Sequence, residues 1–246
     1  MGASLEARAS RSLQPVVLQS RAGMEVVASI IIGGLITILT AIGVEYLRGP
    51  RLALSIEEPP CDILYAATRP ARHARYLRLI LLNRPLPALA RWMLRAPALQ
   101  CRGEITFHHL DGQDVFGRAM AVRWANSPQP IPNQILDLQG QPVFQILDFA
   151  RTAESRIDVY PGEKQIVDVV ARFDEEPDCY GWNNDAYSHQ WRNPDWRLSR
   201  ERYIVKVVIY SSGQKCIGVF RIVNDVDRRT DFRLLPPLKE DADKAL

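Results

Sequence analysis

One uninterrupted apolar stretch near the N-terminus constrains this chain more than any other feature. Residues 26–44, VVASIIIGGLITILTAIGV, hold nineteen positions without a charged side chain. As an α-helix the stretch would be about 28 Å long, which matches the hydrocarbon core of a bilayer. Glu25 and Glu45 bracket it, and Tyr46 adds an aromatic ring of the kind found at membrane interfaces. The stretch therefore predicts an uncleaved, single-pass transmembrane helix over residues 24–47.

Two other interpretations of this stretch fit less well. A core helix of a soluble protein rarely runs this far without a polar face. A cleaved signal peptide usually has a shorter apolar region than this run of nineteen residues.

Small side chains recur at every fourth position of the stretch, at Ser29, Gly33, Thr37 and Ala41. This spacing places them on one helix face, where small residues let two membrane helices approach closely. The pattern predicts helix packing, either as a homo-oligomer or against a partner helix. The alternative is that small residues are simply common in membrane helices.

The arginines on the two sides of the stretch bear on its orientation. Three arginines precede it, and Arg48 and Arg51 follow it. Counted together, they slightly favour a C-terminal domain outside the cytoplasm. Residues 1–23, however, are rich in Arg, Ser and Ala without apolar periodicity, and we expect them to be a disordered leader. With a start at Met24 the rule places the domain in the cytoplasm, which is the orientation that we predict for this cell-membrane protein.

From residue 51 onward the apolar periodicity changes from helical to alternating, which is typical of β-strands. The runs that predict strands occupy residues 51–57, 75–83, 100–110, 116–124, 155–173, 202–210, 215–223 and 230–235. A hairpin is expected around the DG turn at 111–112, and another between the runs that end at 210 and begin at 215. No helices alternate with these runs, so the sequence predicts a mainly β fold, an antiparallel β-sandwich domain over residues 51–235.

A tyrosine near the start of one strand refines this prediction. Leu198 lies five residues before Tyr203, which opens the run at 202–210. Immunoglobulin-like folds often carry a tyrosine there whose hydroxyl bonds back to the preceding loop. The pattern resembles this tyrosine corner, although the Cys…Trp…Cys spacing of antibody domains is not evident. We therefore expect an immunoglobulin-like sandwich.

Three further segments carry expectations. Residues 86–97 place Leu89, Trp92 and Met93 on one helical face, which predicts a packed crossover helix. The proline-rich residues 126–144 should form irregular surface chain. Residues 236–246 have the composition of a disordered tail.

The chain has four cysteines and no CxxC pair, which excludes a zinc ribbon at the level of sequence. Outside the cytoplasm they could form two disulfides. Cys101 and Cys216 lie in strand-like runs, which favours small buried side chains instead.

Charge and motifs argue against several classes of function. The net charge of +3 is too small to indicate a nucleic-acid partner. The signatures of hydrolases, P-loop proteins, zinc proteases and dinucleotide-binding proteins are missing from the sequence. Three aspartates at 225, 227 and 231 faintly resemble a calcium loop, but Arg228 and Arg229 oppose a cation there. We expect no enzyme activity, no cofactor and no metal site.

The segment DCYGWNNDAYSHQWRNPDW, residues 178–196, is the candidate site. Its candidate partner-binding residues are Tyr180, Trp182, Asn184, Tyr187, His189, Trp191 and Trp196. The aromatics could fold back onto the sandwich as a satellite core. They could instead form an exposed face for a protein or glycan. In a third interpretation, His189 joins nearby carboxylates in a metal or acid-base site.

The layout resembles a group of uncharacterised prokaryotic single-pass membrane proteins. The resemblance rests on the short N-terminal helix, the exit formed by Arg48, Pro50, Arg51 and Leu52, and the β-rich domain that follows. It implies a membrane-anchored β domain and no activity. We therefore expect a non-enzymatic interaction or scaffold module at the membrane surface, with an unknown protein partner. The alternative is an envelope glycan- or metal-binding domain or an enzyme that uses residues 178–196.

Overall fold

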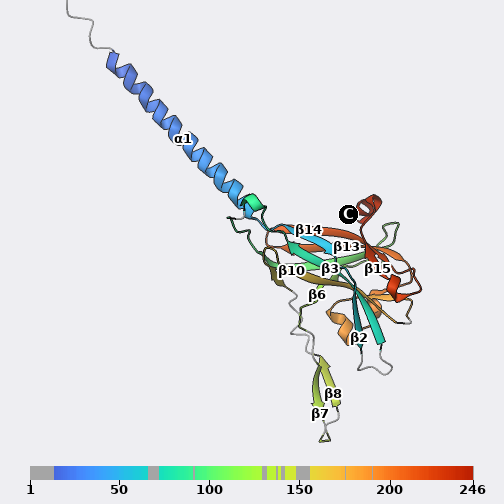
Figure 1. Cartoon of the computed structure of the whole chain (residues 1–246). Coiled ribbons are helices and arrows are strands. Elements are labelled where there is room, and N and C mark those ends of the chain that lie inside the picture. Colours follow the sequence, from blue (N-terminus) through green and yellow to red (C-terminus); the bar gives the residue numbers. More distant parts are fainter. Residues whose placement is uncertain are drawn as a thin grey trace, which may run out of the picture. The chain divides into compact units, whose positions relative to one another are not determined.

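The computed structural model describes residues 14–65, 72–90, 92–128, 132–136, 138–139, 142–147, 156–174, 176–189 and 191–245. The chain divides into two compact units, Met1–Gly49 and Pro50–Leu246. The first contains one long helix, and the second contains the sheets (Figure 1).

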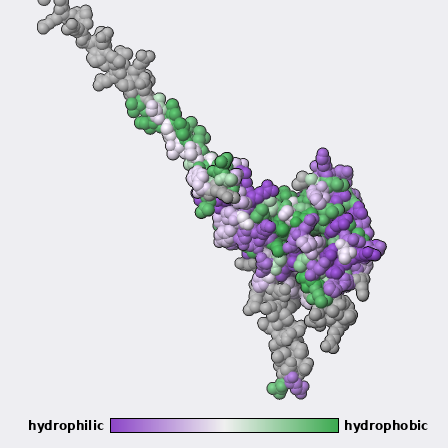
Figure 2. All heavy atoms as spheres, in the orientation of Figure 1, coloured by the Kyte–Doolittle hydropathy of each residue, from purple (hydrophilic) through white to green (hydrophobic). Residues whose placement is uncertain are grey.

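Helix α1 runs over Gln14–Arg48, and its part from Val26 to Arg48 is long and apolar enough to cross a membrane. Its large apolar side chains between Val26 and Leu47 are exposed, apart from the half-buried Val44, and they colour this part of Figure 2 green. The helix begins earlier than expected, so residues 14–23 do not belong to a disordered leader; residues 1–13 lie outside the described residues. Helix growth adds one hydrogen bond per residue, so a stable apolar helix can extend upstream into residues that lack amphipathic periodicity.

The first sheet of the second unit has seven strands. Its central order is β1-β3-β10-β11-β12, with β2 also paired to β3 and β6 to β10. The strands are β1 (Leu52–Ile56), β2 (Cys61–Tyr65), β3 (Arg72–Asn83), β6 (Arg123–Trp124), β10 (Lys164–Phe173), β11 (Cys179–Gly181) and β12 (Arg197–Leu198). Strands β1 and β2 share one edge of β3, separated by the turn that follows Ile56.

The second sheet has six strands in the order β15-β14-β13-β4-β5, with β9 also paired to β4. These are β4 (Ala98–His108), β5 (Met120–Ala121), β9 (Ile157–Val159), β13 (Arg202–Ser211), β14 (Gln214–Val223) and β15 (Arg233–Leu235). All strand pairs in both sheets are antiparallel.

The two sheets pack against each other around one apolar core, as the mainly β prediction required. Every second residue of a strand faces this core. The core side chains include Leu77, Leu79 and Leu81 of β3, Val205, Val207 and Ile209 of β13, Ile105 and Phe107 of β4, and Trp124 of β6.

The predicted tyrosine contact is present. The Tyr203 hydroxyl donates a hydrogen bond to the Ser199 carbonyl oxygen at 3.2 Å, and both Tyr203 and Leu198 are buried. Burial raises the pKa of the phenol to about 12. This geometry is consistent with an immunoglobulin-like sandwich.

The two predicted hairpins have different outcomes. Strands β13 and β14 pair along their full length, from Arg202 opposite Val223 to Ser211 opposite Gln214. The run at 116–124 pairs with β4 through Met120 and Ala121, and the Val122 N–H also donates to the Gly103 carbonyl oxygen at 2.9 Å. The chain then changes sheets, because Arg123 and Trp124 pair with β10 instead.

Three segments differ from the expectations. Among the described residues of 86–97 there is a short 3-10 turn, η1 (Ala88–Ala90), in place of the expected helix, and the flanking prolines at 87 and 97 limit any helix here to the few residues between them. The proline-rich residues form a hairpin of β7 (Pro132–Leu136) and β8 (Pro142–Leu147). Pro132 and Pro142 are the first residues of these two strands, where a missing N–H is tolerated.

The expected disordered tail instead contains helix α2 (Lys239–Ala245). Its Asp241 is fully buried and accepts two hydrogen bonds from Arg221 of β14, at 2.5 and 2.7 Å. The sequence of the tail alone does not predict this contact, because the donor, Arg221, lies in another element.

Candidate functional site

The aromatic segment, residues 178–196, extends the first sheet before it leaves it. Strand β11 pairs with β10, and β12 pairs with β11. Between β11 and β12 the chain forms the 3-10 turns η3 (Asn184–His189) and η4 (Pro194–Trp196). The buried Asn193 side chain accepts a hydrogen bond from the Asp195 backbone N–H at 3.0 Å and so caps η4.

Trp182 belongs to a second apolar cluster, separate from the main core. Only 3% of the residue is exposed, and its ring packs edge-on against Tyr76 with centroids 4.8 Å apart. Tyr76 precedes the core residue Leu77, so it points to the opposite face of β3. Trp182 therefore covers the face of the first sheet that is turned away from the main core.

Trp196 packs into the main core through a close backbone approach. It is 5% exposed, and its ring lies edge-on to Phe116 at 5.0 Å. A Cβ atom at Gly181 would lie 2.8 Å from the Met120 sulfur and 3.0 Å from the Trp196 Cβ. Glycine at 181 is thus required for β11 to pass beside Trp196.

The remaining aromatic candidates are partly buried. Tyr180 and Trp191 pack against the second cluster, and Tyr187 lies 6.1 Å from the Trp182 ring. Burial raises the pKa of Tyr180. Asn184 is half-buried at the start of η3. The segment therefore packs largely as a satellite core, and a partner-binding role for its residues stays a prediction.

His189 is exposed, and the nearby acids are engaged elsewhere. Its Nδ1 lies 3.2 Å from the Asp185 carbonyl oxygen. Glu176 accepts a hydrogen bond from Arg192 at 2.6 Å, and Asp178 pairs with Arg197. Among the described residues, no three His, Cys, Asp or Glu side chains come together as a metal site.

The helix-packing residues Ser29, Gly33, Thr37 and Ala41 lie on the exposed surface of α1. The Thr37 hydroxyl donates a hydrogen bond to the Gly33 carbonyl oxygen at 2.8 Å, which satisfies this polar group within the helix. Their role in self-association stays a prediction.

The four cysteines, Cys61, Cys101, Cys179 and Cys216, are all free. Cys101 and Cys179 are buried, and the other two are half-buried. Burial raises the pKa of Cys101 to about 11 and raises that of Cys179 as well, so neither forms a reactive thiolate at neutral pH.

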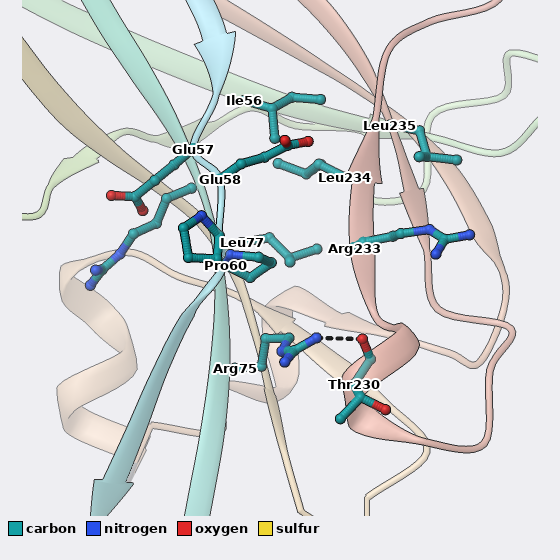
Figure 3. Close-up of a pocket in the computed structure, with 12 residues that line it drawn as sticks. Ile56, Glu57, Glu58, Pro60, Arg75, Leu77, Thr230, Arg233, Leu234 and Leu235 are labelled. Carbon is teal, nitrogen blue, oxygen red and sulfur yellow. Dashed lines mark hydrogen bonds between the residues drawn. The ribbon is translucent and has the colours of Figure 1, made fainter.

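A pocket that the sequence did not indicate lies where the two sheets are open at one edge (Figure 3). We call it the edge pocket, and its volume is about 520 Å³. It is bordered by the turn between β1 and β2, by β3, and by η5 (Arg229–Asp231) with β15. Its lining residues are Ile56, Glu57, Glu58, Pro59, Pro60, Arg75, Leu77, Arg78, Thr230, Arg233, Leu234 and Leu235.

The floor of the edge pocket is apolar and its rim is charged. Ile56, Leu77 and Leu234 point into the space between the strands (Figure 3), and all three belong to or pack against the main core. The rim carries acidic and basic groups, among them Glu58 and Arg233. Such a pocket suits an apolar group that is flanked by polar or charged atoms of both signs.

An ion-pair network holds the two sides of the edge pocket together. Asp62 of β2 accepts hydrogen bonds from Arg75 at 3.0 and 2.8 Å and from Arg229 at 2.9 Å. Arg229 also pairs with Asp174 at 2.8 Å, and Arg75 donates to the Thr230 carbonyl oxygen. The hydrogen bond from Arg75 lowers the pKa of Asp62. The network joins the first sheet to the segment that leads into β15.

A buried carboxylate is hydrogen-bonded to Arg78, one of the residues that line the edge pocket. Asp168 of β10 is fully buried and accepts hydrogen bonds from Arg78 at 2.7 Å and Arg123 at 2.5 Å. The Arg123 guanidinium also lies over the Tyr187 ring at 5.5 Å. The same charge cluster therefore borders both the edge pocket and the aromatic segment.

The residues around the edge pocket are far apart in sequence, at 56–78 and 230–235, and no motif joins them. The two acids and two prolines at 57–60 were the one local signal, and they indicate a turn rather than a site. Comparison with protein families, curated proteins and solved structures found no match to the chain. The resemblance to prokaryotic single-pass proteins therefore goes no further than an N-terminal apolar helix followed by a β-rich domain.

Proposed function

We propose that this protein is a membrane-anchored, immunoglobulin-like β-sandwich module that binds a partner protein through the edge pocket. The observation that carries the proposal is an apolar pocket with a rim of both charges, between the edge strands of two sheets. Edge strands leave backbone N–H and C=O groups on one side, and an extended peptide can bind to them. The pocket next to them would receive an apolar side chain of that peptide.

Pocket chemistry supports a protein partner over other ligands. The lining holds Glu57 and Glu58 as well as three arginines, so it does not select a polyanion. Two of these arginines are already paired with Asp62 and Asp168.

Photo-crosslinking in native membranes tests the pocket directly. A photoreactive amino acid at Leu235, on the pocket lining, should form a discrete adduct with one partner. The same probe at Ile217 on β14, which is 41% exposed and does not line the pocket, should not form this adduct. Arg233→Glu should lower the yield of the Leu235 adduct, whereas the exposed control Lys215→Glu should leave it unchanged. Equal adducts from both probes, or no adduct, would contradict the proposal.

The membrane location is part of the proposal. We propose that α1 anchors the chain in the cell membrane as a single pass and that the sandwich lies on the cytoplasmic side. A reporter that is active on one side of the membrane only, fused after Leu246, checks this orientation. Activity of a periplasmic or extracellular reporter would reverse it without affecting the edge pocket.

A further inference from the structure

The loop between β3 and β4 presents three large apolar side chains to solvent. Leu89 is 95% exposed, Trp92 is 81% exposed and Leu94 is 79% exposed. A tryptophan and two leucines exposed within six residues form an apolar patch of the kind that marks a contact with another surface.

The position of this loop in the domain is set by Asn83, which is fully buried at the end of β3. Its amide nitrogen donates to the Ala96 and Val159 carbonyl oxygens, each at 3.1 Å, and its Oδ1 accepts from the Arg51 N–H at 3.0 Å. The Arg84 N–H also donates to the Arg51 carbonyl oxygen at 2.9 Å. Both ends of the loop are thus held beside Arg51.

Arg51 is where the domain begins. The second unit starts at Pro50, and α1 ends at Arg48. Three peptide units join Arg48 to Arg51, a path of about 11 Å at full extension. The exposed loop therefore lies at the end of the domain that receives the chain from the apolar helix, within reach of the membrane surface in which we place that helix.

The loop has the composition of a membrane-interface segment. Tryptophan and leucine favour the boundary between headgroups and acyl chains. Residues 63–103 contain no Asp or Glu. Two described acids near Asn83 accept backbone hydrogen bonds: Asp158 accepts from the Gln100 N–H at 2.8 Å, and Glu163 accepts from the Tyr160 N–H at 3.1 Å.

A neighbouring turn adds to the same surface. Tyr160 is 56% exposed, and the next residue, Pro161, forms a bridge with Asn83. Leu99, at the start of β4, is 41% exposed. Apolar and aromatic side chains therefore gather around Asn83 at this end of the sandwich.

We infer that the loop with Leu89, Trp92 and Leu94 inserts into the interface of the bilayer that α1 crosses, as a second membrane contact. The inference rests on the proposed anchoring. The two contacts together, one helix and one loop, hold the sandwich in a defined orientation on the membrane surface.

Tryptophan quenching in vesicles tests this insertion. All five tryptophans, at positions 92, 124, 182, 191 and 196, lie outside α1, so quenching by brominated acyl chains does not report the helix. The full chain is reconstituted into vesicles of brominated phosphatidylcholine, with and without phosphatidylglycerol. We expect quenching in the wild type and its loss in Trp92→Phe, a change at an exposed position that leaves the fold intact.

A second pair of variants keeps Trp92 in place. Leu89→Ser together with Leu94→Ser should reduce the quenching. The control Leu64→Ser should not, because Leu64 is 51% exposed on β2, opposite His73 near the other end of β3.

Extraction of the same vesicles with alkaline carbonate separates the two proposals. A chain that resists extraction but shows no quenching, or quenching that persists in Trp92→Phe, would overturn the loop insertion and leave the anchor standing. A chain that carbonate releases would overturn both.

Discussion

Two segments of the sandwich contain tryptophans that differ sharply in exposure. In the aromatic segment, Trp182 is 3% exposed, whereas in the β3–β4 loop Trp92 is 81% exposed. The first segment is bounded by β11 and β12, which pair with the sheet and carry the rings onto it. The second is interrupted by prolines, and its described backbone makes local turns, in which the Ala90 N–H donates to the Pro87 carbonyl oxygen and the Met93 N–H to the Ala90 carbonyl oxygen. Backbone pairing, rather than aromatic content, decides whether a ring is buried.

The same comparison separates stability from function. A ring packed against Tyr76 contributes to folding, and replacing it creates a cavity. A ring in solvent contributes little to folding, so its presence needs another reason. In the segment that looks like a site in sequence, Trp182 and Trp196 are buried, whereas the segment expected to pack as a helix carries the exposed Trp92.

The largest expected effect comes from truncating the buried ring. Trp182→Ala should lower the free energy of unfolding by about 3–5 kcal/mol, because it removes a large aromatic side chain from a packed cluster. Trp92→Ala is the matched control and should change it by less than about 0.5 kcal/mol. Urea unfolding of the detergent-solubilised full chain, followed by circular dichroism, measures both. Similar losses for the two variants would break the comparison.

Asn83 sharpens the comparison, because it holds the exposed loop to the folded domain. Asn83→Ala removes three hydrogen bonds from a fully buried side chain and leaves their partners unsatisfied. We expect a loss of about 2–3 kcal/mol in the free energy of unfolding, with faster amide exchange at Arg84. Asn126→Ala, at an exposed asparagine, should be nearly neutral in the same assay. A neutral Asn83→Ala would mean that the loop is not held from this point.

A pH titration distinguishes helix α2, which a carboxylate holds, from the β3–β4 loop, which contains no Asp or Glu. Hydrogen bonding to Arg221 lowers the pKa of Asp241, so the folded state binds fewer protons than the unfolded state. The bond stabilises α2 above the ordinary aspartate pKa of about 3.9, and this stabilisation is lost as the pH falls through the lower folded value.

Asp241→Asn tests this directly. It should cost about 1–3 kcal/mol at neutral pH and flatten the acid limb of the stability curve. Unfolding free energies of the wild type and the variant, measured from neutral to acid pH, check the prediction. An unchanged acid limb in the variant would show that α2 is held by other contacts.

Patterns among neighbouring residues predicted the features that depend on neighbouring residues. The β13–β14 hairpin follows from alternating apolar residues on both sides of a short turn, and the structure pairs them over their full length. The Tyr203 contact follows from one residue at the start of a strand. The β4–β5 pairing was predicted too long, because β6 pairs better with β10 in the other sheet, and no local pattern records that competition.

The edge pocket could not be predicted in the same way. Its two sides come from residues 56–78 and 230–235, which meet only because β14 pairs with β15 and the two sheets stack. The network of Arg75, Asp62 and Arg229 likewise joins charges that look like ordinary surface residues in the sequence.

The sequence by itself therefore determined an apolar helix of membrane-spanning length and an antiparallel β domain, because helix length and strand alternation are properties of neighbouring residues. Only the tertiary structure decided which tryptophans are buried, where the pocket opens, and that the tail packs through Asp241. These depend on which segments lie side by side, and side chains are buried or left in solvent by partners that are distant along the chain.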